Sequence, residues 1–205
     1  MWVKPGMKQN KLVIGITGGS GCGKSIVAKA ATDLGFIHID GDKLGHKVIL
    51  KPGKTYYKII EEFGDSILDE NGEINRRKLG EIVFSDSEKL NKLNSIIHPS
   101  IIEETRNLLN ERTVIDGAVL HKTPEIVEMC DYIIAVTNSD ERRIEFICNR
   151  DKIDRETAEK RIKSQPDNVY YANFADKVIH SDCEIDELYN KALKVIKECM
   201  GEKNS

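Results

Sequence analysis

The sequence contains neither paired cysteines nor a long apolar run, and these two absences exclude several classes of protein. Its five cysteines are scattered without a C-x-x-C pair, which argues against a structural zinc site and against a disulfide framework. Free cysteines fit a reducing compartment, so we expect a cytoplasmic protein. The chain does not begin with an apolar signal core, and no apolar run approaches the ~20 residues of a membrane-spanning helix, so we expect no membrane partner.

The sequence also lacks a strong excess of charge of either sign. Its formal net charge is −3 and its isoelectric point is near 6.0, so no global field favours nucleic acid or an anionic membrane as a partner. Any anionic ligand must therefore be held by local groups. With 40% hydrophobic and 32% charged residues, the 205 residues are expected to form one folded domain (1–205) that buries its core without disulfide bonds.

Internal repeats and low-complexity tracts are absent as well, and short apolar runs alternate with helical patterns. This alternation is typical of an α/β domain with a mostly parallel sheet. The ten residues MWVKPGMKQN ahead of the first strand are interpreted as a leader, in which Met7 is an alternative start. We expect five strands, at about 12–16, 36–40, 113–116, 132–136 and 177–180.

A long helical region, about 43–110, separates the second and third expected strands. It is too long for a single crossover helix, so we predict an inserted helical subdomain, which the family resemblance described below implies is the acceptor-binding part. Within it, Pro99 is expected in the first turn of a helix, a position that suits proline because its nitrogen has no hydrogen to donate. The apolar stripe of that helix is Ile101, Thr105, Leu108 and Leu109.

A second helical region, about 140–165, is expected to end before Pro166. We interpret the segment 139–168 around it as a lid. Arg161 and Gln165 lie four residues apart in this region and are expected to share one helix face.

Five of the nine arginines fall inside the expected lid. Guanidinium groups there can close over a bound triphosphate and neutralise the charge that develops during phosphoryl transfer. Alternatively, they are solvated charges on a helical hairpin. We favour the first role for Arg150 and Arg161 and the second for Arg142 and Arg155. The five are Arg142, Arg143, Arg150, Arg155 and Arg161.

One motif carries most of the chemistry, because residues 18–25 match the pattern G-x-x-x-x-G-K-[ST] in full. In such a loop, glycines let successive backbone N–H groups converge on phosphate oxygens, and the following helix N-terminus adds positive potential. Lys24 can reach the β- and γ-phosphates of a nucleoside triphosphate, and the Ser25 hydroxyl can ligate Mg²⁺. Cys22 is either a redox handle or a small filler. The residues of the loop are Gly18, Gly19, Ser20, Gly21, Cys22, Gly23, Lys24 and Ser25.

Carboxylates follow two of the expected strands, at the sheet edge where ligands gather in open parallel sheets. Asp40 and Asp42 come at the end of the second strand, and either can orient or deprotonate an attacking hydroxyl, while the other caps the next helix. Asp116 ends the third strand; it either holds Mg²⁺ through water or opens a turn before Gly117.

Taken together, these segments resemble the dephospho-coenzyme A kinase family over nearly the whole chain. The phosphate loop alone is shared by many enzymes, whereas the ordered set is much more specific. The matching segments are IGITGG (14–19), IDGD (39–42), NGEINRRKL (71–79) with IVF (82–84), IIHP (96–99), RIKSQ (161–165) and ADKVI (175–179).

The resemblance implies a P-loop kinase fold, with a five-stranded parallel sheet flanked by helices, an inserted helical subdomain at 43–110 and a lid at 139–168. It implies ATP as donor and the 3′-hydroxyl of dephospho-coenzyme A as acceptor, and it puts the general base at Asp42. In this hypothesis Lys24 holds the β- and γ-phosphates, and Arg150 and Arg161 close from the lid.

Some positions depart from the family pattern, and they concern mainly the acceptor site. Two arginines of the family are replaced, by the Gly45-His46 region and by Ile102, for which Arg106 one turn later is a substitute. The family's D-x-P-L-L-F-E segment is replaced here by residues 116–122, with Ala118 and Lys122, and its late asparagine by Ser181.

Two other functions are compatible with the same motifs. One is a kinase of the same fold for a nucleoside or another small molecule. The other is a nucleotide-binding regulator without turnover; against it, residues 137–140 (TNSD) do not form the guanine-reading N-K-x-D motif. The sequence leaves open whether the protein is a monomer or a small homo-oligomer.

Overall fold

The computed structural model describes residues 11–117 and 120–201, so the interpreted leader and Ala118 lie outside the described residues. The chain divides into two units. We call the described residues up to Asp40 and from Leu109 onward the sheet unit, and Gly41–Leu108 the helical unit. Each unit has a hydrophobic core of its own.

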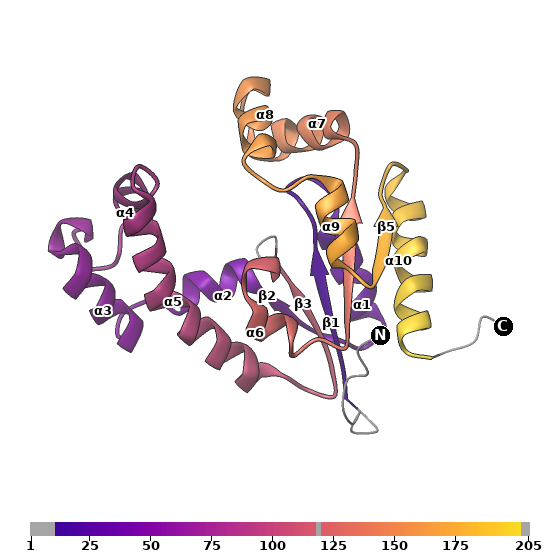
Figure 1. Cartoon of the computed structure of the whole chain (residues 1–205), viewed down its shortest axis with the longest axis horizontal. Helices are drawn as coiled ribbons and strands as arrows, with labels where there is room; N and C mark the ends of the chain where they lie inside the picture. The colour runs from indigo at the N-terminus through magenta and orange to yellow at the C-terminus, as the bar shows by residue number, and fades with distance from the viewer. Residues whose placement is uncertain (1–10, 118–119, 202–205) are drawn as a thin grey trace. The chain divides into compact units, whose positions relative to one another are not determined.

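The sheet unit is built on five strands in the order β2-β3-β1-β4-β5, and every pairing is parallel (Figure 1). The central strand β1 has β3 on one side and β4 on the other, so the order reverses at β1, where ligands of open α/β sheets bind beside the carboxyl ends. The predicted parallel five-stranded sheet is confirmed. The strands are β1 (Leu12–Thr17), β2 (Ile37–Asp40), β3 (Arg112–Asp116), β4 (Tyr132–Thr137) and β5 (Lys177–His180).

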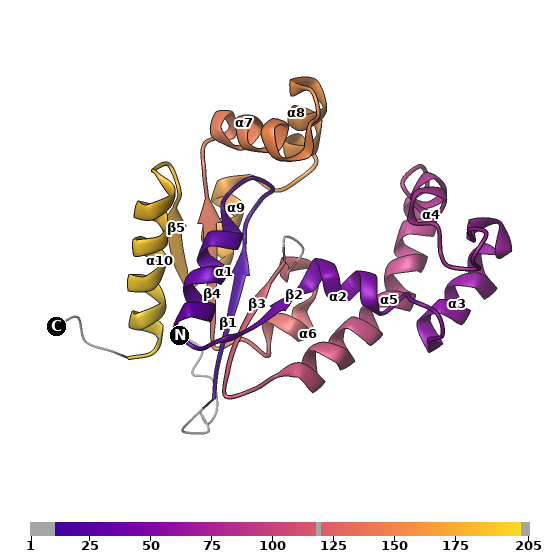
Figure 2. The same ribbon diagram turned by 180° about the vertical axis from the view of Figure 1, so that it is seen from behind.

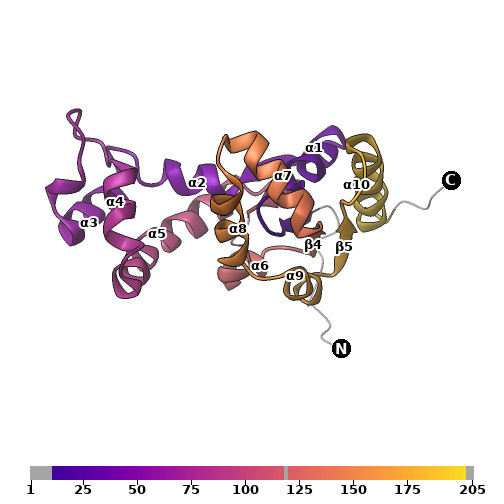
Figure 3. The ribbon, with the colours of Figure 1, turned by 90° about the horizontal axis from the view of Figure 1, so that it is seen from above.

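Helices cover both faces of this sheet. Helices α1 (Lys24–Asp33) and α10 (Ile185–Cys199) pack against each other on one face, seen from behind in Figure 2. Figure 3 shows α6 (Pro124–Val127) and α9 (Asn168–Phe174) on the opposite face. The short η2 (Leu120–Lys122) precedes α6.

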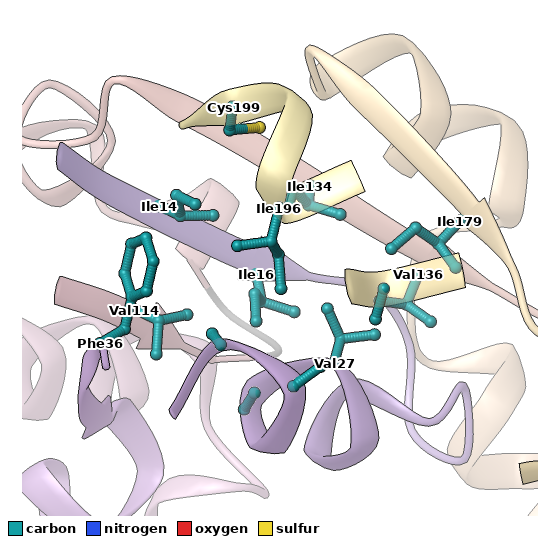
Figure 4. Packing of buried hydrophobic residues seen from close by; sticks show 14 of the residues in the cluster. Ile14, Ile16, Val27, Phe36, Val114, Ile134, Val136, Ile179, Ile196 and Cys199 are labelled. Atoms are coloured by element: carbon teal, nitrogen blue, oxygen red, sulfur yellow. The ribbon is translucent and has the colours of Figure 1, made fainter. Parts of the chain in front are cut away.

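The core of the sheet unit lies between the sheet and the α1/α10 layer. Its centre is formed by Ile14 and Ile16 of β1, Val27 of α1 and Ile196 of α10, all of them fully buried (Figure 4). The apolar spacing in α1 produces this packing, since Val27, Ala30 and Ala31 fall on one face of the helix. The phosphate loop is therefore followed by a helix that is rigidly attached to the sheet.

The lid region forms a helical hairpin, α7 (Asp140–Asp151) and α8 (Arg155–Lys163). The helices are separate because Lys152 adopts a left-handed backbone with φ of 55°, and Asp154 caps α8 by accepting a hydrogen bond from the Thr157 N–H at 2.7 Å. The two helices share a small apolar cluster of their own.

The predicted shared helix face of Arg161 and Gln165 is wrong. Helix α8 ends at Lys163, and Gln165 lies beyond its C-cap residue, Ser164. The turn closes because the Gln165 N–H bonds to the Ile162 carbonyl at 3.1 Å, and Pro166 follows, whose ring disfavours helical backbone at the residue before it. Gln165 therefore lies outside α8 and does not share a helix face with Arg161.

The helical unit packs three helices against one long helix, α5 (Ser87–Leu108). Those three are α2 (Gly41–Lys47), α3 (Lys54–Phe63) and α4 (Arg76–Val83), and the turn η1 (Asp65–Ile67) follows α3. Asn75 caps α4 through bonds from the Arg77 and Lys78 N–H groups. Of the described helices in either unit, none has the length and apolar character that crossing a bilayer needs.

The expected helix start at Pro99 is also wrong, because Pro99 lies inside α5, and Leu109 lies past its end. A proline within a helix removes one backbone hydrogen bond and costs about 3 kcal/mol. Helix α5 continues through it because α2, α3 and α4 all pack against α5, and Leu93 and Thr105 are buried on either side of the proline. Tertiary packing therefore outweighs the local preference.

Candidate active site

The phosphate loop, residues 18–25, joins the carboxyl end of β1 to the first turn of α1, which is the context that the motif requires. Gly18 and Gly21 have φ values of 139° and 79°, a backbone that other residues rarely adopt. A Cβ at Gly18 would lie 2.2 Å from the Val136 carbonyl oxygen, because the loop passes directly against β4. The loop conformation therefore depends on glycine at these positions.

The N-terminus of α1 is suited to an anion. Its N-cap residue is Gly23, which has no side chain to cap the first N–H groups. Lys24 opens the helix, and its ammonium donates to the Gly18 and Gly19 carbonyls, each at 3.0 Å. The next residue, Ser25, is exposed. Two consecutive residues thus supply an ammonium and a hydroxyl at the positively polarised end of the helix.

Cys22 is fully buried within the core of the sheet unit. Burial raises the pKa of its thiol, and the nearby charges of Arg143 and Lys24 oppose this only in part. Because the thiolate is the reactive form of cysteine, these features favour the filler role over the redox handle.

Arg143 and Gln165 both contact the phosphate loop at Ser20. Arg143 is buried, and its Nε donates to the Ser20 carbonyl at 3.0 Å, while Gln165 Oε1 accepts from the Ser20 N–H at 2.8 Å. Neither residue is among those that the sequence predicts for the site. One signal was available, since Arg143 is four residues before the buried Ile147 and thus on the apolar face of α7, where a charge needs a specific partner.

Arg150 and Arg161, the two arginines predicted to act on the triphosphate, both pair with Asp151 at the turn between α7 and α8. Arg150 does so through two bonds, at 2.7 and 3.0 Å, and Arg161 through Nη1. The Arg150 and Arg161 bonds together hold the pKa of Asp151 well below its usual range. The two guanidinium groups are therefore gathered at one point by a shared carboxylate.

Asp151→Asn is expected to reduce the stability of the protein at neutral pH but not in acid. The folded-state pKa of Asp151 lies below its unfolded value, so its contribution is complete above about pH 4 and is lost as pH falls through the folded value. The difference in Tm between wild type and variant is therefore expected to stay constant above about pH 4 and to shrink as the pH falls from there to about 2, as thermal melts will measure. A Tm difference that does not change with pH would contradict the stabilising role assigned to the ionised Asp151 carboxylate.

Arg142 and Arg155, which were expected to be solvated, both lie on the surface. The Arg155 side chain is 57% exposed and bridges Glu141 and Glu159. The Arg142 side chain is 46% exposed, and its Nη1 donates a hydrogen bond to the Cys183 carbonyl at 3.1 Å.

At the opposite side of β1, Asp116 ends β3. It is in register with Ile16 of β1 and with Asp40 of β2, so Asp40 and Asp116 lie side by side at the carboxyl edge. The Asp116 side chain is 16% exposed, and its Oδ2 lies 3.7 Å from His38 Nε2.

A hydroxyl at Ser25 and a carboxylate at Asp116 are hard oxygen donors of the kind that Mg²⁺ prefers. Within residues 11–117 and 120–201, no group of three or more His, Cys, Asp or Glu side chains could hold a metal ion alone.

Asp42 belongs to the helical unit. It lies in the first turn of α2 and is exposed, and Asp40 is the residue directly before that helix. The end of β2 thus leads straight into a helix start, where acidic side chains are favoured by the helix dipole.

A cavity of about 400 Å³ adjoins the phosphate loop within the sheet unit. Gly21 and Gly23 of the loop form part of its wall. The rest comes from α1, the connection between β4 and α7, α7 itself, the region between β5 and α10, and α10, including Ile26, Asn138, Arg142, Phe146 and Leu188. Its walls combine apolar side chains with amide groups, as small-molecule sites do.

The positions that depart from the family pattern lie in different parts of the structure. Ser181 is buried, and its hydroxyl lies 2.8 Å from the Cys22 carbonyl and 3.1 Å from the Thr137 carbonyl, tying the loop to β4. His46 is exposed near Arg76, with Nδ1 3.4 Å from Nη1. Ile102 lies in α5 and Lys122 in η2. Ser181 thus supports the phosphate loop itself.

Known proteins resemble this chain in both sequence and structure. The family model described as dephospho-CoA kinase matches residues 12–187. A dephospho-CoA kinase of Fusobacterium nucleatum is 41% identical over 185 residues, which cover 88% of this chain and 94% of that protein. A dephospho-CoA kinase from Campylobacter jejuni has a similar structure, with a TM-score of 0.60 at 26% identity over 92% of this chain and 97% of that one. TT1252 from Thermus thermophilus has the same fold, with a TM-score of 0.76 at 23% identity over 92% of this chain and 98% of that one.

Proposed function

Because the chain belongs to the dephospho-CoA kinase family, we propose that it transfers the γ-phosphoryl group of ATP to the ribose 3′-hydroxyl of dephospho-CoA, the last step of coenzyme A biosynthesis. The observation that carries the proposal is a complete phosphate loop between β1 and α1, in a chain that matches the family model over residues 12–187. The products are coenzyme A and ADP.

The donor ATP is assigned to the sheet unit. The backbone N–H groups of residues 18–25 and the Lys24 ammonium hold the β- and γ-phosphates, and the N-terminus of α1 adds its positive potential. The nucleoside occupies the cavity beside the loop, whose volume of about 400 Å³ is adequate for a base and sugar. There the Arg142 guanidinium and the Phe146 ring provide flat surfaces for a base to stack on.

Magnesium is assigned to Ser25 and Asp116, the hydroxyl directly and the carboxylate through water. When bound, Mg²⁺ neutralises charge on the β- and γ-phosphate oxygens. Arg150 and Arg161 provide further positive charge as transfer proceeds, and their present partner, Asp151, keeps them ordered until then.

The acceptor is assigned to the helical unit, Gly41–Leu108. Asp42 accepts the proton of the 3′-hydroxyl as its oxygen bonds to the γ-phosphorus, and the bond from phosphorus to the β,γ-bridging oxygen breaks to release ADP. Positioning and charge carry most of the rate, because little covalent work falls to the protein in phosphoryl transfer. We further propose a cytoplasmic enzyme without a nucleic-acid partner.

An ADP-release assay with a panel of acceptors tests the proposal. We expect dephospho-CoA to exceed nucleosides, nucleotides and sugar acids in kcat/KM by about 10³-fold or more, because the acceptor must be held for in-line attack. Coenzyme A is the matched control, since its 3′-hydroxyl already carries a phosphate. Mass spectrometry of the product should show one added phosphoryl group at the ribose.

A kinase of the same fold for another small molecule is the second candidate. The departures at His46, Ile102 and Lys122 favour it, because they fall where the family's acceptor contacts are expected. Turnover with a nucleoside but not with dephospho-CoA would establish this alternative, and tight ATP binding without turnover on any acceptor would indicate a regulator.

A further inference from the structure

All three polar groups of Ser20 in the phosphate loop are bound by side chains from the lid segment. The Ser20 carbonyl accepts from Arg143 Nε at 3.0 Å, and its N–H donates to Gln165 Oε1 at 2.8 Å. Its hydroxyl accepts from Gln165 Nε2 at 2.9 Å. These partners lie 123 and 145 residues further along the chain, so the contacts exist only in the folded protein.

Arg143 and Gln165 are also bonded to each other. Arg143 Nη2 donates to Gln165 Oε1 at 3.2 Å, and Nη1 donates to Asp140 Oδ1 at 2.8 Å. The Arg143 side chain is 2% exposed, and a buried guanidinium is stable only when its N–H groups have acceptors. The Ser20 carbonyl and the Gln165 side-chain carbonyl supply two of these acceptors. The contact therefore stabilises the buried arginine as well as the loop.

The loop is shaped to receive these side chains. A Cβ at Gly19 would come within 2.3 Å of Arg143 Nη2, so the guanidinium occupies space that a side chain at this residue would need. A Cβ at Gly21 would lie 2.9 Å from the Arg143 backbone carbonyl oxygen, so the start of α7 is in direct contact with the loop. Two glycines within the loop, Gly19 and Gly21, thus leave room for Arg143.

We propose that Arg143 and Gln165 are positioning residues that hold the phosphate loop in its binding conformation before ATP arrives. Arg143 is in the first turn of α7, and Gln165 is two residues beyond α8, so both ends of the hairpin are anchored on Ser20. ATP then binds to an ordered loop and does not bear the entropic cost of ordering it. The inference rests on the proposed function only in taking ATP as the ligand of the loop.

Binding of ATP and ADP to the Arg143→Lys and Gln165→Met variants, measured by calorimetry, tests the proposal. Each variant is expected to weaken both nucleotides by about tenfold, since each loses one or two hydrogen bonds to Ser20. Lysine keeps the charge but not the planar fork that reaches two acceptors at once. Methionine keeps the volume of glutamine without its polar groups. Combining both substitutions should weaken binding by less than the product of the single effects, because they hold the same residue.

Arg155→Lys is the matched control, because Arg155 is an exposed arginine of the same hairpin that pairs with Glu141 and Glu159. It should bind both nucleotides like wild type, and thermal melts will establish that every variant is folded. Wild-type affinity in Arg143→Lys and Gln165→Met would overturn the proposal. So would a loss confined to ATP, which would indicate direct contact with the γ-phosphate. Failure of the wild-type protein to bind ATP would instead contradict the proposed function.

Discussion

Asparagine in place of Asp42 is expected to lower kcat by about 10²- to 10⁴-fold, while the Kd for ATP stays near that of wild type. Asparagine keeps the shape of the side chain but cannot accept the proton of the attacking 3′-hydroxyl. The affinity for ATP should persist, because we assign the donor contacts to the sheet unit, whereas Asp42 belongs to the helical unit. Steady-state kinetics with saturating dephospho-CoA and calorimetric titration with ATP measure the two quantities.

The parallel variant Asp40→Asn discriminates between the two acids at the end of β2. Asp40 lies beside Asp116 in the sheet register and directly before α2, so we expect its loss to affect stability and cation binding more than kcat. Glu61→Gln on α3 removes an exposed carboxylate of the helical unit and serves as the control for charge. If Asp42→Asn turns over at the wild-type rate and Asp40→Asn does not, the base is Asp40.

Methionine in place of Lys24 is expected to lower kcat/KM for ATP by about 10³-fold. The substitution removes the ammonium that we propose binds the β- and γ-phosphates. It also removes the bonds to the Gly18 and Gly19 carbonyls, each at 3.0 Å, that hold the loop closed upon itself. Both nucleotide binding and the chemical step should suffer, so single-turnover kinetics and ADP titration are needed together.

Lys29→Met is the matched control for this variant. Lys29 lies in the same helix, α1, but its side chain is 63% exposed and pairs with Asp33 at 2.6 Å. Exposed pairs of this kind contribute little, so kcat/KM should stay within about twofold of wild type. Equal activity of Lys24→Met and Lys29→Met would mean that the backbone amides of the loop suffice to hold the phosphates.

The predicted strands and the phosphate loop agree with the structure because their signals are local. The short apolar runs become the buried strands β1, β3 and β4, and the family resemblance is confirmed by the match over residues 12–187. The expected start of a helix at Pro99 was wrong, because the contacts of α5 with α2, α3 and α4 lie outside any local window.

The sequence by itself determined the phosphate loop and its surroundings. Positive φ at Gly18, Gly21 and Gly23 is a steric property of those residues, and the strand before them and the helix after them are encoded by adjacent apolar patterns. The motif and the elements on either side of it can therefore be recognised from neighbouring residues alone.

Only the tertiary structure decided which side chains complete the loop. Arg143 and Gln165 meet at Ser20 because β4 delivers the start of α7 to the loop and the end of α8 returns there. Arg150 and Arg161 contact Asp151 instead, because the turn at Lys152 brings α7 and α8 together. The contacts of Arg143 and Gln165 with Ser20 span more than a hundred residues, and the contact of Arg161 with Asp151 spans the turn of the α7–α8 hairpin. No spacing in the sequence specifies where two helices cross.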